Sequence, residues 1–194
     1  MKQNRENPFF ETYRTPFGTP PFDQIETEQY EPVFDEGIRQ LDEEVRAIAD
    51  NTELPTFENT IIALERSGKL LDKVISAFFN VLNAEADDEM MDISQRVSPK
   101  LSESSNNIYL NEQLFARVKS VYDRKDELHL PMEDARLLEK TFEAFCARGA
   151  ALGPEEKEKY RKLSSELSLL SLTFDQNALK DKNRYELLLT KEDE

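Results

Sequence analysis

Apolar residues recur every three or four positions along most of the chain, which is the spacing that places side chains on one face of an α-helix. The first apolar face comprises Tyr30, Phe34, Ile38, Leu41, Val45 and Ile48. Further faces of this kind start at Phe57, Leu71, Met90, Leu114, Ala135 and Tyr160. The pattern predicts an all-α fold, an irregular bundle of about six to seven helices.

Capping residues mark where several of these helices begin and end. Thr27, Thr56 and Asn111 each precede an apolar face and can accept a hydrogen bond from the first helical turn. Gly68 follows the short face that starts at Phe57, as is typical of a helix C-terminus. Pro154 stands where the last and longest helix begins, because proline suits the first helical turn.

The longest helix carries apolar residues at heptad spacing, with successive intervals of 3, 4, 3 and 4 positions. These residues are Tyr160, Leu163, Leu167, Leu170 and Phe174. Such a row predicts a face buried against a neighbouring helix, although two repeats are too short for a free coiled coil. We expect Leu167 in the core of the bundle, and Leu169 and Leu172 on a second face that awaits another partner.

The first 26 residues are predicted to form an extended arm rather than a helix, because proline fixes the backbone and lacks a donor. The prolines are Pro8, Pro16, Pro20 and Pro21, and the arm also carries the aromatic residues Phe9, Phe10, Tyr13, Phe17 and Phe22. A disordered segment rarely contains so many aromatic side chains. We expect the arm to lie on a surface, either that of its own helices or that of another domain.

The period of the pattern changes near the C-terminus, where residues 185–190 (YELLLT) predict a β-strand. A single strand needs a partner for its backbone donors and acceptors, and no other segment of the chain predicts one. We therefore expect three parts: the arm at 1–26, a helical domain at 27–182, and a strand at 183–194 that continues into a longer protein.

Composition narrows the class of partner. The chain has 194 residues, with 25 Lys and Arg against 40 Asp and Glu, so its formal net charge is −15. This charge argues against nucleic acid and against an anionic membrane as partners. No apolar run approaches the ~18 residues of a membrane span, and the polar first eight residues do not resemble a signal peptide. We expect a cytoplasmic protein.

Residues for catalysis or metal binding are scarce. The chain has one His, His129, and one Cys, Cys146, whereas a zinc site needs three or four ligands that are mostly of these types. We interpret His129 as a loop residue without a catalytic role and Cys146 as a small core residue. The acidic run of Asp87, Asp88 and Glu89 is expected to stabilise a helix N-terminus rather than to bind a cation. The residues alone therefore predict no catalytic and no metal site, and substrate-binding residues stay unknown.

Three segments carry a resemblance to a known family. They are residues 32–40 (PVFDEGIRQ), 57–68 (FENTIIALERSG) and 107–118 (NIYLNEQLFARV), of which the second is the most specific. In this order, they resemble the N-terminal portion of the thimet-oligopeptidase family of zinc metallopeptidases, and within it the peptidyl-dipeptidase branch. The resemblance extends over nearly the whole chain.

The resemblance implies a structural part of an enzyme. The zinc motif of the family, His-Glu-x-x-His with a later Glu, has no counterpart here, so no catalytic or metal residue can be transferred. The implied role is one wall of a channel that admits short peptides, with the catalytic half of the same chain as partner. The parent enzyme would bind one zinc ion, which polarises the scissile carbonyl and activates water, and would release dipeptides from a peptide C-terminus.

Two alternatives stay open at this point. The chain could be the N-terminal part of an endo-acting oligopeptidase of the same family. It could also be a free-standing acidic helical adaptor that binds a partner protein, which the charge of −15 and the heptad row would suit.

Overall fold

The computed structural model describes residues 7–85 and 87–184, and these residues are predominantly helical. The long helices are α1 (Tyr30–Ala49), α3 (Lys69–Glu85), α4 (Asp88–Tyr109), α5 (Glu112–Tyr122), α6 (Met132–Ala147) and α7 (Pro154–Arg184). Shorter elements are the π-helix η4 (Phe57–Ile62), its continuation α2 (Ala63–Glu65), and the 3₁₀ turns η1 (Pro8–Phe10), η2 (Pro16–Gly18) and η3 (Thr27–Gln29). The prediction of an all-α bundle is confirmed.

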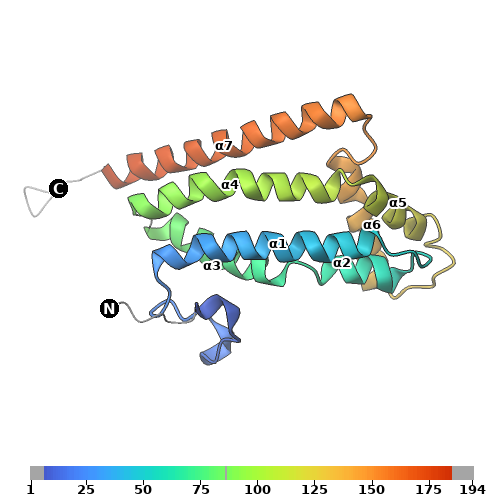
Figure 1. Ribbon diagram of the computed structural model, residues 1–194, viewed down its shortest axis with the longest axis horizontal. Helices are drawn as coiled ribbons and strands as arrows, with labels where there is room; N and C mark the ends of the chain where they lie inside the picture. The colour runs from blue at the N-terminus through green and yellow to red at the C-terminus, as the bar shows by residue number, and fades with distance from the viewer. Residues whose placement is uncertain (1–6, 86, 185–194) are drawn as a thin grey trace, which may run out of the picture.

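The helices form stacked layers along the long axis of the molecule. Figure 1 shows α1 and α3 side by side, α4 above them, and α7 above α4 as the outermost helix. Helices α5 and α6 close the end at which α1 terminates, and they pack on each other. Helix α7 rests mainly on α4, so much of its circumference faces away from the bundle.

Two apolar clusters form the core. The first lies where α1, α3 and α4 meet and is centred on Phe34, Val74, Phe78 and Val97. The second joins the other end of α1 to η4, α5 and α6, and is centred on Ile61, Leu114, Val118, Leu138 and Phe145. Most of these residues come from the predicted apolar faces of the first six helices, so the spacing of apolar residues identified the buried faces there.

Helices α1 and α3 approach each other closely at a glycine. A Cβ atom added to Gly37 would lie 3.0 Å from the Cα atom of Leu71, which is tighter than nine in ten real Cβ contacts. A side chain at position 37 would therefore push the two backbones apart. Gly37 is buried, and its missing side chain is what allows the contact.

The N-terminal arm lies on its own helices. Phe9 is buried in the first cluster, and its ring lies 5.5 Å from that of Tyr30, which in turn lies 5.0 Å from that of Phe78. Of the two surfaces left open by the sequence, the surface of its own helices is confirmed for this part of the arm. Phe17 and Phe22 are exposed, so the arm also presents aromatic side chains outward.

Helix α7 buries a different face from the one predicted. Four of the five heptad residues are exposed, namely Leu163 (65%), Leu167 (63%), Leu170 (61%) and Phe174 (72%). The expectation that Leu167 lies in the core is wrong. The face turned toward the bundle contains Lys157, Ser164, Ser168, Leu172 and Gln176, which are mostly polar and are buried or half-buried.

The physical reason is that α7 is held on α4 by polar contacts. Asn106 donates a hydrogen bond of 2.8 Å to Ser164, and Gln176 donates one of 3.0 Å to Ser94. Leu172, which was assigned to an unpartnered face, is half-buried beside Phe79. Hydrophobic spacing cannot reveal a face that is buried through hydrogen bonds.

The C-terminal boundary is only partly described. Helix α7 continues to Arg184, two residues beyond the predicted end of the helical domain at 182. The predicted strand at 185–190 lies outside the described residues.

Candidate functional surfaces

The three places where the sequence offered chemistry are separate in the fold. His129 is exposed in the loop between α5 and α6, as interpreted from the sequence. Cys146 is exposed near the end of α6, so its interpretation as a core residue is wrong. It follows the fully buried Phe145, and one step along a helix turns the side chain by about 100°.

The acidic run at 87–89 begins helix α4. Asp87 is the N-cap residue, and its carboxylate accepts a hydrogen bond of 2.8 Å from the backbone N–H of Met90. The predicted role at a helix N-terminus is thus confirmed.

Among residues 7–85 and 87–184, no group of three or more His, Cys, Asp and Glu side chains is placed to hold a metal ion. No helix in this described part is long and apolar enough to cross a membrane.

The most specific sequence segment, 57–68, is built as a structural joint. The Thr56 hydroxyl accepts a hydrogen bond of 3.0 Å from Asn59 N–H, and the Asn59 side chain accepts one of 2.8 Å from Thr56 N–H. This reciprocal pair is a capping box, and it confirms Thr56 as the predicted cap. At the other end, Gly68 donates its N–H to Glu44 of α1 at 2.7 Å.

A buried arginine on α5 completes this joint. The Arg117 guanidinium donates to the carbonyl oxygens of Asn51 at 2.6 Å and Glu53 at 3.0 Å, and to Asn59 Oδ1 at 3.0 Å. A longer bond of 3.3 Å reaches the Thr60 hydroxyl. All four acceptors are neutral, so the cation holds the loop after α1 and η4 together through oriented dipoles. Segments 57–68 and 107–118, which both carry the resemblance, meet at Arg117.

A lysine on α3 fastens the N-terminal arm. Lys73 donates to the carbonyl oxygens of Phe9 at 2.8 Å and Glu11 at 2.6 Å, and its Nζ atom lies 3.7 Å from the centre of the Tyr13 ring. Burial lowers the pKa of Lys73 from its ordinary value. Burial, and to a smaller extent the nearby Tyr30, raise the pKa of Tyr13 to about 12. The Tyr13 hydroxyl is buried without a hydrogen-bond partner.

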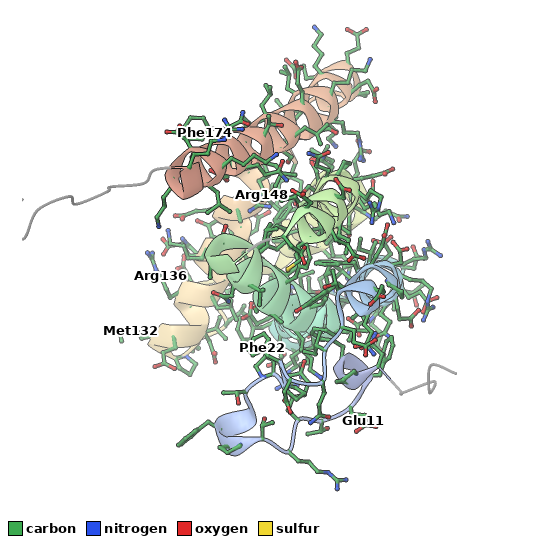
Figure 2. The ribbon with its side chains drawn as sticks, turned by 90° about the vertical axis from the view of Figure 1, so that its left-hand side faces the viewer. Glu11, Phe22, Met132, Arg136, Arg148 and Phe174 are labelled. Carbon is green, nitrogen blue, oxygen red and sulfur yellow. The ribbon has the colours of Figure 1, made fainter. Side chains whose placement is uncertain are left out.

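A groove runs beside the contact between α4 and α7. Its volume is about 660 Å³, and hydroxyl groups line it from both helices: Ser98, Ser102 and Ser105 of α4, and Ser164, Ser168 and Ser171 of α7. Arg148 closes one end of the groove. Its Cζ atom lies 4.2 Å from the centre of the Tyr109 ring, and its guanidinium donates a hydrogen bond of 3.0 Å to the Ser105 hydroxyl. Figure 2 shows Arg148 beneath α7, between that helix and the bundle.

The exposed heptad residues form the second surface feature of α7. We call Leu163, Leu167, Leu170 and Phe174 the outer row. Phe174 projects from the side of α7 turned away from the bundle in Figure 2. Leu167 also borders the groove, so the outer row and the groove are neighbours. Together they make an apolar and hydroxyl-rich surface with no partner among the described residues.

Sequence reasoning missed the polar residues that position these surfaces. Arg117 and Gln176 looked like ordinary polar helix residues, because their partners lie 57–66 and 81–85 positions away in the chain. The available signal for Arg117 was its position three residues after Leu114 and four before Val121, which places it on the helix face that periodicity assigns to the core. For Gln176, no local signal existed.

Comparison with known proteins gives a consistent relationship. No protein-family model matches the chain. Over 173 residues, or 89% of this chain, it is 42% identical to the dipeptidyl carboxypeptidase of Escherichia coli and 39% identical to that of Salmonella typhimurium. It is 26% identical over 82% of its length to the thimet-like oligopeptidase of Dictyostelium discoideum. These matches confirm the resemblance to the oligopeptidases.

The relatives are much longer than this chain. The chain spans 25% of each of the two dipeptidyl carboxypeptidases and 23% of the thimet-like oligopeptidase. About three quarters of each relative therefore has no counterpart in these 194 residues.

Proposed function

Because the chain is homologous to the dipeptidyl carboxypeptidases over nearly nine tenths of its length, we propose that it is the N-terminal helical domain of a zinc peptidase of that kind. The main support for this proposal is that the chain is 42% identical to the Escherichia coli enzyme and yet spans only a quarter of that enzyme. In this proposal, the chain forms one wall of the channel through which short peptides reach the catalytic half. The whole enzyme would be cytoplasmic.

In this proposal, one part of the polypeptide forms the channel wall and the other part carries out catalysis. The described residues hold no cluster of metal ligands, so the zinc ion and the residues that activate water would come from the remaining three quarters. Zinc would there polarise the scissile carbonyl and lower the pKa of a bound water. The described residues would contribute a rigid, acidic wall, with Arg117 and Lys73 fixing its loop and its arm.

The peptidyl-dipeptidase activity is favoured over the endo-acting alternative because the chain is more similar in sequence to the dipeptidyl carboxypeptidases than to oligopeptidase A. Identity is 42% to the dipeptidyl carboxypeptidase of Escherichia coli and 23% to its oligopeptidase A. We therefore propose that the parent enzyme releases dipeptides from the free C-terminus of short peptides. The free-standing adaptor has no comparable support, since relatives at this identity are peptidases by name.

The test is to produce the complete gene product and, separately, these 194 residues. Each is incubated with one short peptide in two forms, with a free and with an amidated C-terminus, and the products are identified by mass spectrometry. We expect the complete product to release dipeptides from the free form only, to lose activity with a chelator and to regain it with zinc. The 194-residue chain should not cleave either form.

Three outcomes would contradict the proposal in different ways. Internal cleavage of the amidated peptide would indicate the endo-acting alternative. A gene product that ends with this chain and cleaves nothing would favour the adaptor. Cleavage by the purified 194 residues would place catalytic groups in the part that we assign to the wall.

A further inference from the structure

The outer row of α7 is an apolar feature that the described part of the bundle leaves uncovered. Leu163, Leu167, Leu170 and Phe174 are each more than 60% exposed, and they lie along three turns of one helix. Isolated exposed apolar residues are common, but a continuous row is typical of a surface that interacts with a further segment or molecule. From 163 to 174 the row extends about 17 Å at a rise of 1.5 Å per residue.

The outer row lies on the side of α7 opposite the face that contacts α4. Phe174 and Gln176 are two residues apart and so about 200° apart around the axis. Gln176 is buried against α4, where it bonds to Ser94, while Phe174 is 72% exposed. Helix α7 therefore has one completed polar face and one open apolar face.

We propose that the outer row docks an amphipathic helix from the part of the peptidase that lies outside these 194 residues. The inference rests on the proposed function for the identity of this partner. The intervals of 3 and 4 positions along the row match the spacing at which one helix packs into another at a shallow crossing angle. An apolar row of equal length on the partner would sandwich α7 between that helix and α4.

Two observations favour this occupant over a second copy of the chain. The 173 matched residues are 25% of each dipeptidyl carboxypeptidase, so about three quarters of such an enzyme is available to cover the row. A second copy would bring together two chains of charge −15, which repel each other. The remainder of the same polypeptide is also held nearby at a high effective concentration.

Thiol labelling tests the proposal directly. In a Cys146→Ser background, which removes the exposed native thiol, Leu170→Cys reports on the row. Lys180→Cys, at an exposed position on a flank of the same helix, is the matched control. Each variant is labelled with a maleimide in the 194-residue chain and in the complete gene product, and the rates are compared.

We expect Leu170→Cys to react at least roughly tenfold more slowly in the complete product than in the 194-residue chain, because a covered site reacts only after local opening. The Lys180→Cys rate should change much less. A second variant, Leu170→Glu, should lower the melting temperature of the complete product and leave that of the 194-residue chain unchanged.

The readouts separate the two proposals. Equal labelling of Leu170→Cys in both forms, with dipeptide release intact, overturns the docking proposal and leaves the proposed function standing. Slow labelling in the 194-residue chain together with a dimer in sedimentation assigns the row to a second copy and also overturns it. Protection of the row in a complete product that cleaves no peptide supports docking and refutes the peptidase function.

Discussion

Gln176 in α7 donates a hydrogen bond of 3.0 Å to Ser94 in α4, which lies 82 positions earlier in the chain. The same amide reaches the carbonyl oxygen of Met91 at 3.3 Å, and its oxygen accepts from Gln95 at 3.0 Å. One buried amide thus joins the last helix to residues 91–95, about one turn of α4. This contact lies on the side of α7 that faces the bundle, whereas the outer row is exposed on the other side.

Gln176→Ala should therefore destabilise the chain by about 1–3 kcal/mol, because Ser94 and the Met91 carbonyl lose a buried partner. Urea denaturation followed by circular dichroism measures the change. The matched control is Asn177→Ala, at the next and exposed position of α7, which should shift stability by less than about 0.5 kcal/mol. Equal effects of the two variants would contradict the role assigned to Gln176.

Leu167→Ala should cost less than about 1 kcal/mol in the 194-residue chain, because this side chain is 63% exposed. Leu114→Ala, at a fully buried leucine of α5, should cost about 2–5 kcal/mol under the same conditions. The two variants carry the same chemical change at sites of opposite burial. A large loss with Leu167→Ala would show that the outer row is buried in this chain after all.

Arg117→Ala should cost about 2–4 kcal/mol, since it removes a cation that bonds to two main-chain carbonyls and two side chains. The loop after α1 should then exchange its amide hydrogens faster. Arg136→Ala is the control, because Arg136 makes an exposed ion pair with Glu139 within α6, of a kind worth little. If Arg117→Ala were as stable as the unaltered chain, the role assigned to Arg117 in holding the loop after α1 to η4 would be wrong.

Gly37→Ala should destabilise by about 1–3 kcal/mol, because its Cβ would lie 3.0 Å from the backbone of Leu71 and would separate α1 from α3. The higher helix propensity of alanine would offset part of this cost. Arg46→Ala, on the exposed side of α1, tests the effect of an alanine without the close contact. Thermal melts of the two variants beside the unaltered chain measure both.

Stability should fall as pH rises above the ordinary tyrosine pKa. The pKa of Tyr13 is about 12 in the folded chain and about 10 when unfolded, so below pH 10 both states hold the proton. Between pH 10 and 12, the unfolded chain releases the proton first, and the folded state loses its advantage. Burial shifts the pKa of Tyr30 in the same direction, whereas the lowered pKa of Lys73 acts with the opposite sign.

Urea denaturation at a series of alkaline pH values measures this loss, with tyrosinate absorbance as an independent titration. Tyr13→Phe should remove most of the pH dependence in this range. It should not lower stability at neutral pH, because removing a buried hydroxyl that has no partner breaks no hydrogen bond. An unchanged slope in Tyr13→Phe would show that another group titrates.

The first six helices were predictable because their apolar faces enter the core. Val74 and Phe78 on α3, and Leu114 and Val118 on α5, are fully buried at the positions that the periodicity assigns. The cap at Thr56 was predictable for a local reason, since its partner is three residues away. Such features depend on residues that are neighbours in the sequence.

Which face of α7 is buried was not predictable, because the residues that pair with this face lie far away in the sequence. Its sequence contains an apolar row and a polar row, and hydrophobicity favours burying the apolar one. Within this chain, α4 presents Ser94 and Asn106 to α7, which pair with Gln176 and Ser164. The prediction that His129 and Cys146 form no catalytic site came from residue counts and stays a prediction, whereas the outer row became visible only with the fold.

The fastening of the arm by Lys73 affects the order in which the chain acquires structure during synthesis. Lys73 comes 64 positions after Phe9, whose carbonyl it binds. At about 5–20 residues per second, a ribosome needs roughly 3–13 s to add that many residues. The arm is therefore synthesised well before α3, the helix that carries Lys73. Its aromatic side chains spend that interval as nascent chain, before the helix that receives them has been made.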